Sequence, residues 1–252
     1  MSAIRWERAL PPALVFHVLA HLPLGRDAAS LFDETLPRRA WVNELLEAYA
    51  AAPGRLWVHA LGLRHREGME ALREAPPPGL RDEAGQRLLR CLLDAMASER
   101  EGLLQAWQAS AVEADARRAE VITRIAEPLT MLRRALWEQQ GEPPPLLVLD
   151  CPALGLAGRG ASDARGRVVA VSLAAPVEHL LCQIVHEEIH PVTDPIVRES
   201  SRITTQDTRA GTPGHALHGA LEHAAIEVGE ALIEARAPQW SGAYARWRGR
   251  FG

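Results

Sequence analysis

Apolar residues recur at helical spacing through most of the first 140 residues. Leu88, Leu92, Met96 and Leu103 predict a long helix over residues 81–109. Prolines and glycines delimit further predicted helices at residues 12–22, 37–51, 55–75 and 112–140. We therefore expect residues 1–140 to form a helical N-terminal region.

The pattern changes after Gly141. The runs "PLLVLD" and "RVVAVSLA" have the length and the β-branched content of strands, and they predict a strand pair that could be a hairpin. The segment "GLAGRGASDARG" between them has the composition of a turn or loop. These elements predict an α+β fold, predominantly helical, with a small β-sheet in residues 141–252 and both regions in one integrated domain.

Two more helices are expected after the strands. The first begins near Pro176 and should end at or near His190, because Pro191 biases the residue before it away from helical geometry. A loop of about twenty residues should follow, and then a long helix from His215 to Ala237, just before Pro238.

Composition narrows the choice of partners. The formal net charge is −4, so no large basic field favours nucleic acid. No apolar stretch reaches the roughly 20 residues that span a bilayer, and no signal-peptide pattern is present, so we expect a cytoplasmic protein that does not bind membranes. The three cysteines, Cys91, Cys151 and Cys182, have no metal-binding spacing and do not indicate a disulfide framework.

The sequence "HEEIH" at 186–190 carries the chemistry. His186 and His190 stand four residues apart, on one face of a helix, where two imidazoles can reach one zinc ion at about 2.0–2.1 Å. Glu187 lies beside that face and could take a proton from a zinc-bound water without ligating the metal. Apolar neighbours such as Ile184 and Ile189 indicate a helix within a core.

Catalytic zinc takes three protein ligands and leaves one position open. The last predicted long helix offers several candidates, and we favour Glu222, which would share a face with Ala225, Ile226 and Gly229. Glu227 is the main rival, and His218, one turn before Glu222, could be a ligand or could stabilise an oxyanion. Asp194 could orient a ligand imidazole, although Asp-Pro more often begins a turn.

"HEEIHPVTDP" together with "LEHAAIEVGEAL" resembles the gluzincin-type zincin metallopeptidases, most closely their poorly characterised bacterial branch. The resemblance spans residues 145–236 and implies a zincin-like catalytic core. It implies His186, His190 and Glu222 as ligands of one zinc ion and Glu187 as general base. The metzincin extension H-x-x-G-x-x-H and the gluzincin signature N-E-x-x-S-D are both missing.

These observations predict a zinc-dependent hydrolase, specifically a metallopeptidase acting on a peptide or protein. His215, His218, Tyr244 or an arginine could stabilise the oxyanion, and "RVVAVSL" could be the sheet edge that pairs with an extended peptide. The alternative is a zincin-like binding or regulatory module without catalysis.

A second pair of histidines, His17 and His21, also stands four residues apart, but no acidic residue follows His17. Packed, hydrogen-bonded histidines are the favoured interpretation of this pair, and a second metal site is the alternative.

Overall fold

The computed structural model describes residues 4–22, 39–52, 57–203 and 211–250. The fold is α+β and predominantly helical, as predicted. Its helices are α1 (Leu10–Ala20), α3 (Val42–Ala51), α4 (Trp57–Arg64), α5 (Glu83–Ala109), α6 (Ala111–Trp137), α7 (Val177–Ser201), α8 (Pro213–Arg236) and α9 (Ser241–Arg248). Its strands are β1 (Ile4–Arg8), β2 (Leu146–Asp150), β3 (Gly158–Asp163) and β4 (Gly166–Val171).

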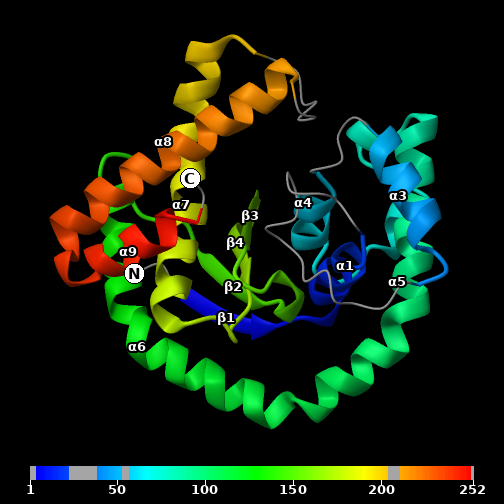
Figure 1. Ribbon diagram of the computed structural model, residues 1–252, viewed down its shortest axis with the longest axis horizontal. Coiled ribbons are helices and arrows are strands. Elements are labelled where there is room, and N and C mark those ends of the chain that lie inside the picture. Colours follow the sequence, from blue (N-terminus) through cyan, green and yellow to red (C-terminus); the bar gives the residue numbers. More distant parts are fainter. Residues whose placement is uncertain (1–3, 23–38, 53–56, 204–210, 251–252) are drawn as a thin grey trace.

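The four strands form one mixed sheet in the order β1-β2-β4-β3. Strands β1, β2 and β4 are parallel, and β3 runs antiparallel to β4 at the edge. Helices cover both faces (Figure 1). Alternate strand residues divide between two cores: one face packs on α6 and α7 through Leu146, Val148, Val169 and Val171, and the other packs on α1 and α4 through Leu147, Leu149, Val168 and Ala170.

The strands correct the sequence prediction in three places. The N-terminal region is not all helical, because β1 pairs with β2. The two predicted strands do not form a hairpin, because β2 and β4 are parallel neighbours. The hairpin partner of β4 is β3, which lies in the glycine-rich segment that we expected to be a loop.

The glycines of β3 serve close packing. A Cβ atom at Gly158 would lie 2.5 Å from Cγ of Gln183, and one at Gly160 would lie 3.0 Å from Oε2 of Glu187. The contact at Gly158 is with a side chain of α7, and the contacts at Gly160 are with Glu187 of α7 and with Nη2 of Arg167 in β4, which would lie 2.9 Å away. Glycine therefore lets the motif helix approach the edge strand, a use that glycine in a strand often has.

The long predicted helices α5, α6 and α8 are confirmed within a few residues of their expected ends. Helix α8 begins where Thr212 accepts a hydrogen bond from the backbone N–H of His215, with Pro213 in the first turn. The helix expected over 55–75 is shorter, since α4 ends at Arg64 and only a 3₁₀ turn, Glu70–Arg73, follows. The predicted boundaries at Pro23, Pro37 and Pro53 lie outside the described residues.

The motif helix does not end at His190. Helix α7 continues through Pro191 and Pro195 to Ser201. A proline at position 191 cannot donate to the carbonyl of Glu187, four residues earlier. Nη2 of Arg167 donates to that carbonyl instead, at 2.5 Å. An arginine from β4 thus replaces the lost helical hydrogen bond, which the sequence pattern around Pro191 could not reveal.

Helix α8 lies across α7, and α9 packs against both (Figure 1). Ala225 and Gly229 of α8 are buried at this contact, as the sequence predicted for the face of Glu222. The Tyr244 hydroxyl donates to the carbonyl of Ile226 and lies directly over Gly229. Among the described residues, no helix is both long and apolar enough to cross a membrane.

Substitution of Gly229 tests the packing of α8. In Gly229→Ala the new methyl group would overlap the Tyr244 hydroxyl and lie 3.1 Å from Cδ1 of Ile189. We expect a loss of about 1–3 kcal/mol in the free energy of unfolding, as for overpacked cores. Gly219→Ala, in the same helix but with no atom within 4 Å of the new Cβ, is the control and should stabilise by about 0.5–1 kcal/mol. Urea denaturation measures both, and equal effects would contradict the packing described.

Candidate metal centre

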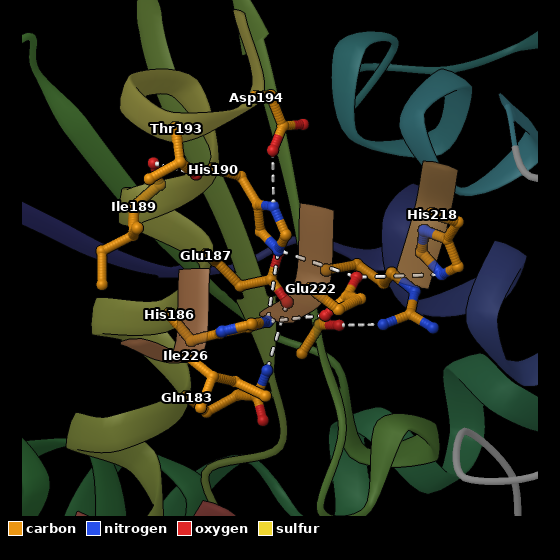
Figure 2. A network of polar contacts seen from close by, with 12 residues as sticks. Gln183, His186, Glu187, Ile189, His190, Thr193, Asp194, His218, Glu222 and Ile226 are labelled. Atoms are coloured by element: carbon orange, nitrogen blue, oxygen red, sulfur yellow. Dashed lines mark hydrogen bonds and ion pairs between the residues drawn. The ribbon is translucent and has the colours of Figure 1, made fainter. Parts of the chain in front are cut away.

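A cleft of about 800 Å³ opens between α7, α8 and β3, with α4 at its rim. His186, Glu187, His190, His218 and Glu222 all line it. Figure 2 shows these side chains converging from α7 and α8. A larger groove, of about 1240 Å³, lies between α6 and the end of α8, and none of these five residues lines it.

Three side chains bring potential ligand atoms together in the cleft. Nε2 of His186 lies 3.2 Å from Nε2 of His190 and 3.0 Å from Oε2 of Glu222, and Nε2 of His190 lies 3.7 Å from Oε1 of Glu222. Ligands of a tetrahedral zinc ion, at about 2.0–2.1 Å from the metal, are separated by about 3.3 Å. The described residues contain two groups of this kind, and this one surrounds a point that a metal ion could occupy.

Asp194 fixes the orientation of His190. Nδ1 of His190 lies 2.9 Å from Oδ1 of Asp194. An ionised carboxylate can only accept, so Nδ1 carries the proton and donates it, and the neutral ring keeps its Nε2 lone pair for a metal. Asp194 can do this because α7 continues past Pro191 and brings residue 194 one turn above His190.

The Glu222 carboxylate is held in its charged form. Burial alone would raise its pKa, but the hydrogen bond and charge of His186, with the charges of His190 and His218, outweigh burial and lower the pKa of Glu222 to about 2. Burial alone would lower the pKa of His190, but the hydrogen bond to Asp194 and the neighbouring carboxylates raise it. A metal cation bound between the two imidazoles would likewise place positive charge beside the Glu222 carboxylate and favour its charged form.

Glu187 lies beside the three ligand atoms without joining them. Its Oε1 accepts a hydrogen bond from Nε2 of Gln183 at 3.1 Å, and Oε1 of Gln183 accepts one from Nε1 of Trp247, also at 3.1 Å. Its other oxygen lies against Gly160 of β3. The carboxylate is therefore positioned by α9 and the edge strand and remains at the wall of the cleft.

The next residue, Glu188, points away from the cleft and into the protein. It is fully buried, and its two oxygens lie 2.6 Å from Nε of Arg133 and 3.2 Å from Nε of Arg167. Arg133 comes from α6 and Arg167 from β4. Adjacent glutamates of the motif thus face opposite ways, one toward the cleft and one toward the sheet.

The other predicted site residues divide between cleft and periphery. His218 lines the cleft, with Nε2 at 3.8 Å from Oε1 of Glu222, and burial and the charge of Arg159 lower its pKa. Glu227 lies on the exposed face of α8, where it pairs with His223 at 3.1 Å. Tyr244 is buried under α8, and neither it nor His215 lines the cleft.

Charge in the cleft is mainly positive. Its acidic lining residues are Glu187, Asp194 and Glu222, and its arginines are Arg64, Arg159, Arg167, Arg198 and Arg250. Cys151 and Cys182 are buried in the core and do not line the cleft, and burial raises the pKa of Cys182 to about 12. A cysteine nucleophile is therefore not part of this cleft.

Sequence reasoning missed the residues that support the site. Gln183 stands one turn before Glu187 on the motif helix, so helical spacing could have identified it. Arg133, Arg167 and Trp247 come from distant parts of the chain, and no local pattern marks them. The interpretation of "RVVAVSL" as the sheet edge was wrong, because β4 is interior and β3 is the edge strand.

Removing the Glu188 carboxylate should be strongly destabilising. Glu188→Ala leaves two buried arginines without their shared partner, and such losses amount to about 3–5 kcal/mol. Glu178→Ala, on the same helix, removes an exposed pair with Arg124 and should lower the free energy of unfolding by about 1 kcal/mol or less. Urea denaturation in the presence of a chelator separates this effect from metal binding. Similar losses in the two variants would show that the buried cluster is unimportant.

Comparisons with known proteins were negative at every level. The chain matches no protein-family model, no curated protein and no solved structure.

Proposed function

We propose that this protein is a zinc-dependent hydrolase that cleaves peptide bonds, with His186, His190 and Glu222 as the metal ligands. One observation carries the proposal. Two consecutive helices bring the Nε2 atoms of His186 and His190 and the two oxygens of Glu222 to separations of 3.0–3.7 Å, close to those between ligands of one zinc ion, with the Glu187 carboxylate beside them.

The donor set fits zinc. Two imidazoles and one carboxylate are the ligands of several catalytic zinc sites, and the fourth position stays open for water or substrate. The Glu222 side chain is about 35% exposed, so the site opens to the cleft. A zinc ion held there would polarise a scissile carbonyl and lower the pKa of an adjacent water to about 7.

Glu187 supplies the proton transfer. Its carboxylate lines the same cleft as the three proposed ligands, and its hydrogen bond from Gln183 limits its rotation. As general base it takes a proton from the attacking water, and as general acid it returns that proton to the leaving amine. Arg159 and His218 line the same cleft and are the candidates to stabilise the charge that develops on the carbonyl oxygen.

The edge strand supplies a place for an extended peptide. Gly158, Gly160 and Ser162 are every second residue of β3, so their backbone N–H and C=O groups point to the same side of the strand. The carbonyls of Gly158 and Ser162 accept hydrogen bonds from the side chains of Arg159 and Arg64, which places this row on the side away from β4. A substrate strand added there would pass directly beside Glu187, in the mode known as β-addition.

A Glu187→Gln substitution tests the general base. Glutamine keeps the shape of the side chain but cannot accept the proton, so kcat/KM on a fluorogenic peptide library should fall by at least about two orders of magnitude. The zinc content, measured by mass spectrometry, should be unchanged. A variant as active as the wild type would contradict the role of Glu187. Zinc-loaded wild-type protein that cleaves no peptide would favour the alternative of a zincin-like binding module.

A second pair of variants tests the third ligand. Glu222→Gln should weaken zinc binding by more than the 10- to 100-fold that loss of an outer hydrogen-bonding partner produces, because a direct ligand is lost. Glu227→Gln, on the exposed face of the same helix, is the matched control and should bind zinc like the wild type. Competition with a chromophoric chelator gives both affinities. If only the Glu227→Gln variant bound zinc more weakly, Glu227 and not Glu222 would be the third ligand.

A further inference from the structure

The histidine pair on α1 has the same internal geometry as the pair on α7. The rings of His17 and His21 have their centroids 4.9 Å apart and cross at 86°. The corresponding values for His186 and His190 are 4.7 Å and 80°. His21 caps α1 with helical backbone angles, so both rings lie on one face, one turn apart.

A glutamate from another helix completes this group, as Glu222 does in the cleft. Glu99 lies on α5, and its Oε2 is 3.3 Å from Nε2 of His17. One ligand atom from each of His17, His21 and Glu99 lies within 4.8 Å of the other two. The distance between His17 and Glu99 already equals the roughly 3.3 Å expected between ligands of one tetrahedral zinc ion.

The Glu99 carboxylate is held with one oxygen toward the histidines. Nε1 of Trp41 donates to Oε1 at 3.2 Å, and Nε of Arg39 lies 3.1 Å from the same oxygen. Ligand carboxylates are commonly held in this way by hydrogen bonds to the oxygen that does not face the metal. Trp41 also packs edge-on against the ring of His21, with centroids 5.6 Å apart.

The environment of this group differs from that of the cleft. His21 and Glu99 are each about 8% exposed, and the His17 side chain is about 20% exposed. Val18 stands where the motif on α7 has its general base, so no carboxylate follows the first histidine. The group lies at the contact of α1 with α5, beside the core of the helical N-terminal region.

We propose that His17, His21 and Glu99 form a second divalent-metal site, structural in role, that binds zinc or a similar transition-metal ion and ties α1 to α5. A cation shared by two imidazoles and a carboxylate would offset the cost of burying these polar groups at one point. Because Ala13 and Phe16 of α1 also pack against the sheet, a metal here would fix the helical region relative to the strands. This site does not depend on the proposed peptidase function.

The test is the zinc content of the full chain after loading and dialysis, with any affinity tag removed. Wild-type protein should hold about two zinc ions per chain, and both Glu99→Gln and His186→Ala should hold about one. The doubly substituted chain should hold none. His223→Ala, whose ring is exposed on α8, is the control and should keep both. Glutamine at position 99 retains an oxygen for Trp41, so the local packing is preserved.

The His186→Ala background isolates the second site and avoids any folding defect near α1. Cobalt(II) bound in this variant should give visible ligand-field absorption bands that disappear when His17→Gln is added. A His186→Ala chain that binds no metal at all, with a wild type that holds one ion, would overturn the proposal. If the cleft itself binds no zinc, the wild type would hold one ion that survives His186→Ala and is lost in Glu99→Gln, so failure of each site is separately visible.

Discussion

The buried contact of Glu188 with Arg133 and Arg167 fixes the position of the motif helix. Each ion in it would be expensive to bury alone, so the cluster adds little net stability when it is complete. It does restrict the rotation of α7, because only one orientation places Glu188 between α6 and β4. That orientation turns His186 and His190 toward α8. We infer that the arginines select the face of the helix on which metal chemistry can occur.

Arg167 also supports the backbone of α7, in addition to its contact with Glu188. Its guanidinium contacts the Glu188 carboxylate, the Glu187 carbonyl and the Ser162 hydroxyl at the same time. The carbonyl contact replaces the hydrogen bond that Pro191 cannot make, so the helix continues. Because α7 continues past Pro191, Asp194 and Arg198 lie on its added turns and line the cleft. One side chain from the sheet therefore positions the backbone of Glu187 and supports the turns of α7 that carry Asp194 and Arg198.

Features that depend on residues close together in sequence could be predicted from the sequence, whereas features that depend on contacts between distant residues could not. Helices such as α5 and α8 are repetitive along the chain, so their apolar spacing and caps predicted them well. Glu222 could be chosen from several acidic residues because its helical face also carries Ala225 and Gly229, which pack toward α7. Contacts between sites separated by tens of residues, such as Arg133 with Glu188, leave no local pattern.

The errors have the same origin. The strand β1 is short and its partner lies some 140 residues away, so nothing near it in sequence indicated a sheet. Strand β3 has the composition of a loop, since its glycines accommodate the close approach of α7 and have low strand propensity. Pro191 does not end α7, although a proline usually disfavours helical geometry in the residue before it, because Arg167 donates the hydrogen bond that Pro191 cannot make. In each case the deciding partner was distant.

The two proposed metal sites differ in their surroundings and not in the spacing of their histidines. Ring spacing and ring angle are almost the same in both, and each pair receives one carboxylate from a second helix. The differences lie in the surroundings. The α7 pair faces an open cleft, with a carboxylate at the next residue and arginines among the lining residues, so water and polar groups can reach it. The α1 pair faces helix α5 and an indole, with valine at the next residue, so a cation there would be enclosed and without a base. Spacing of the imidazoles determines where a cation can bind, and access with a free carboxylate determines whether chemistry can follow.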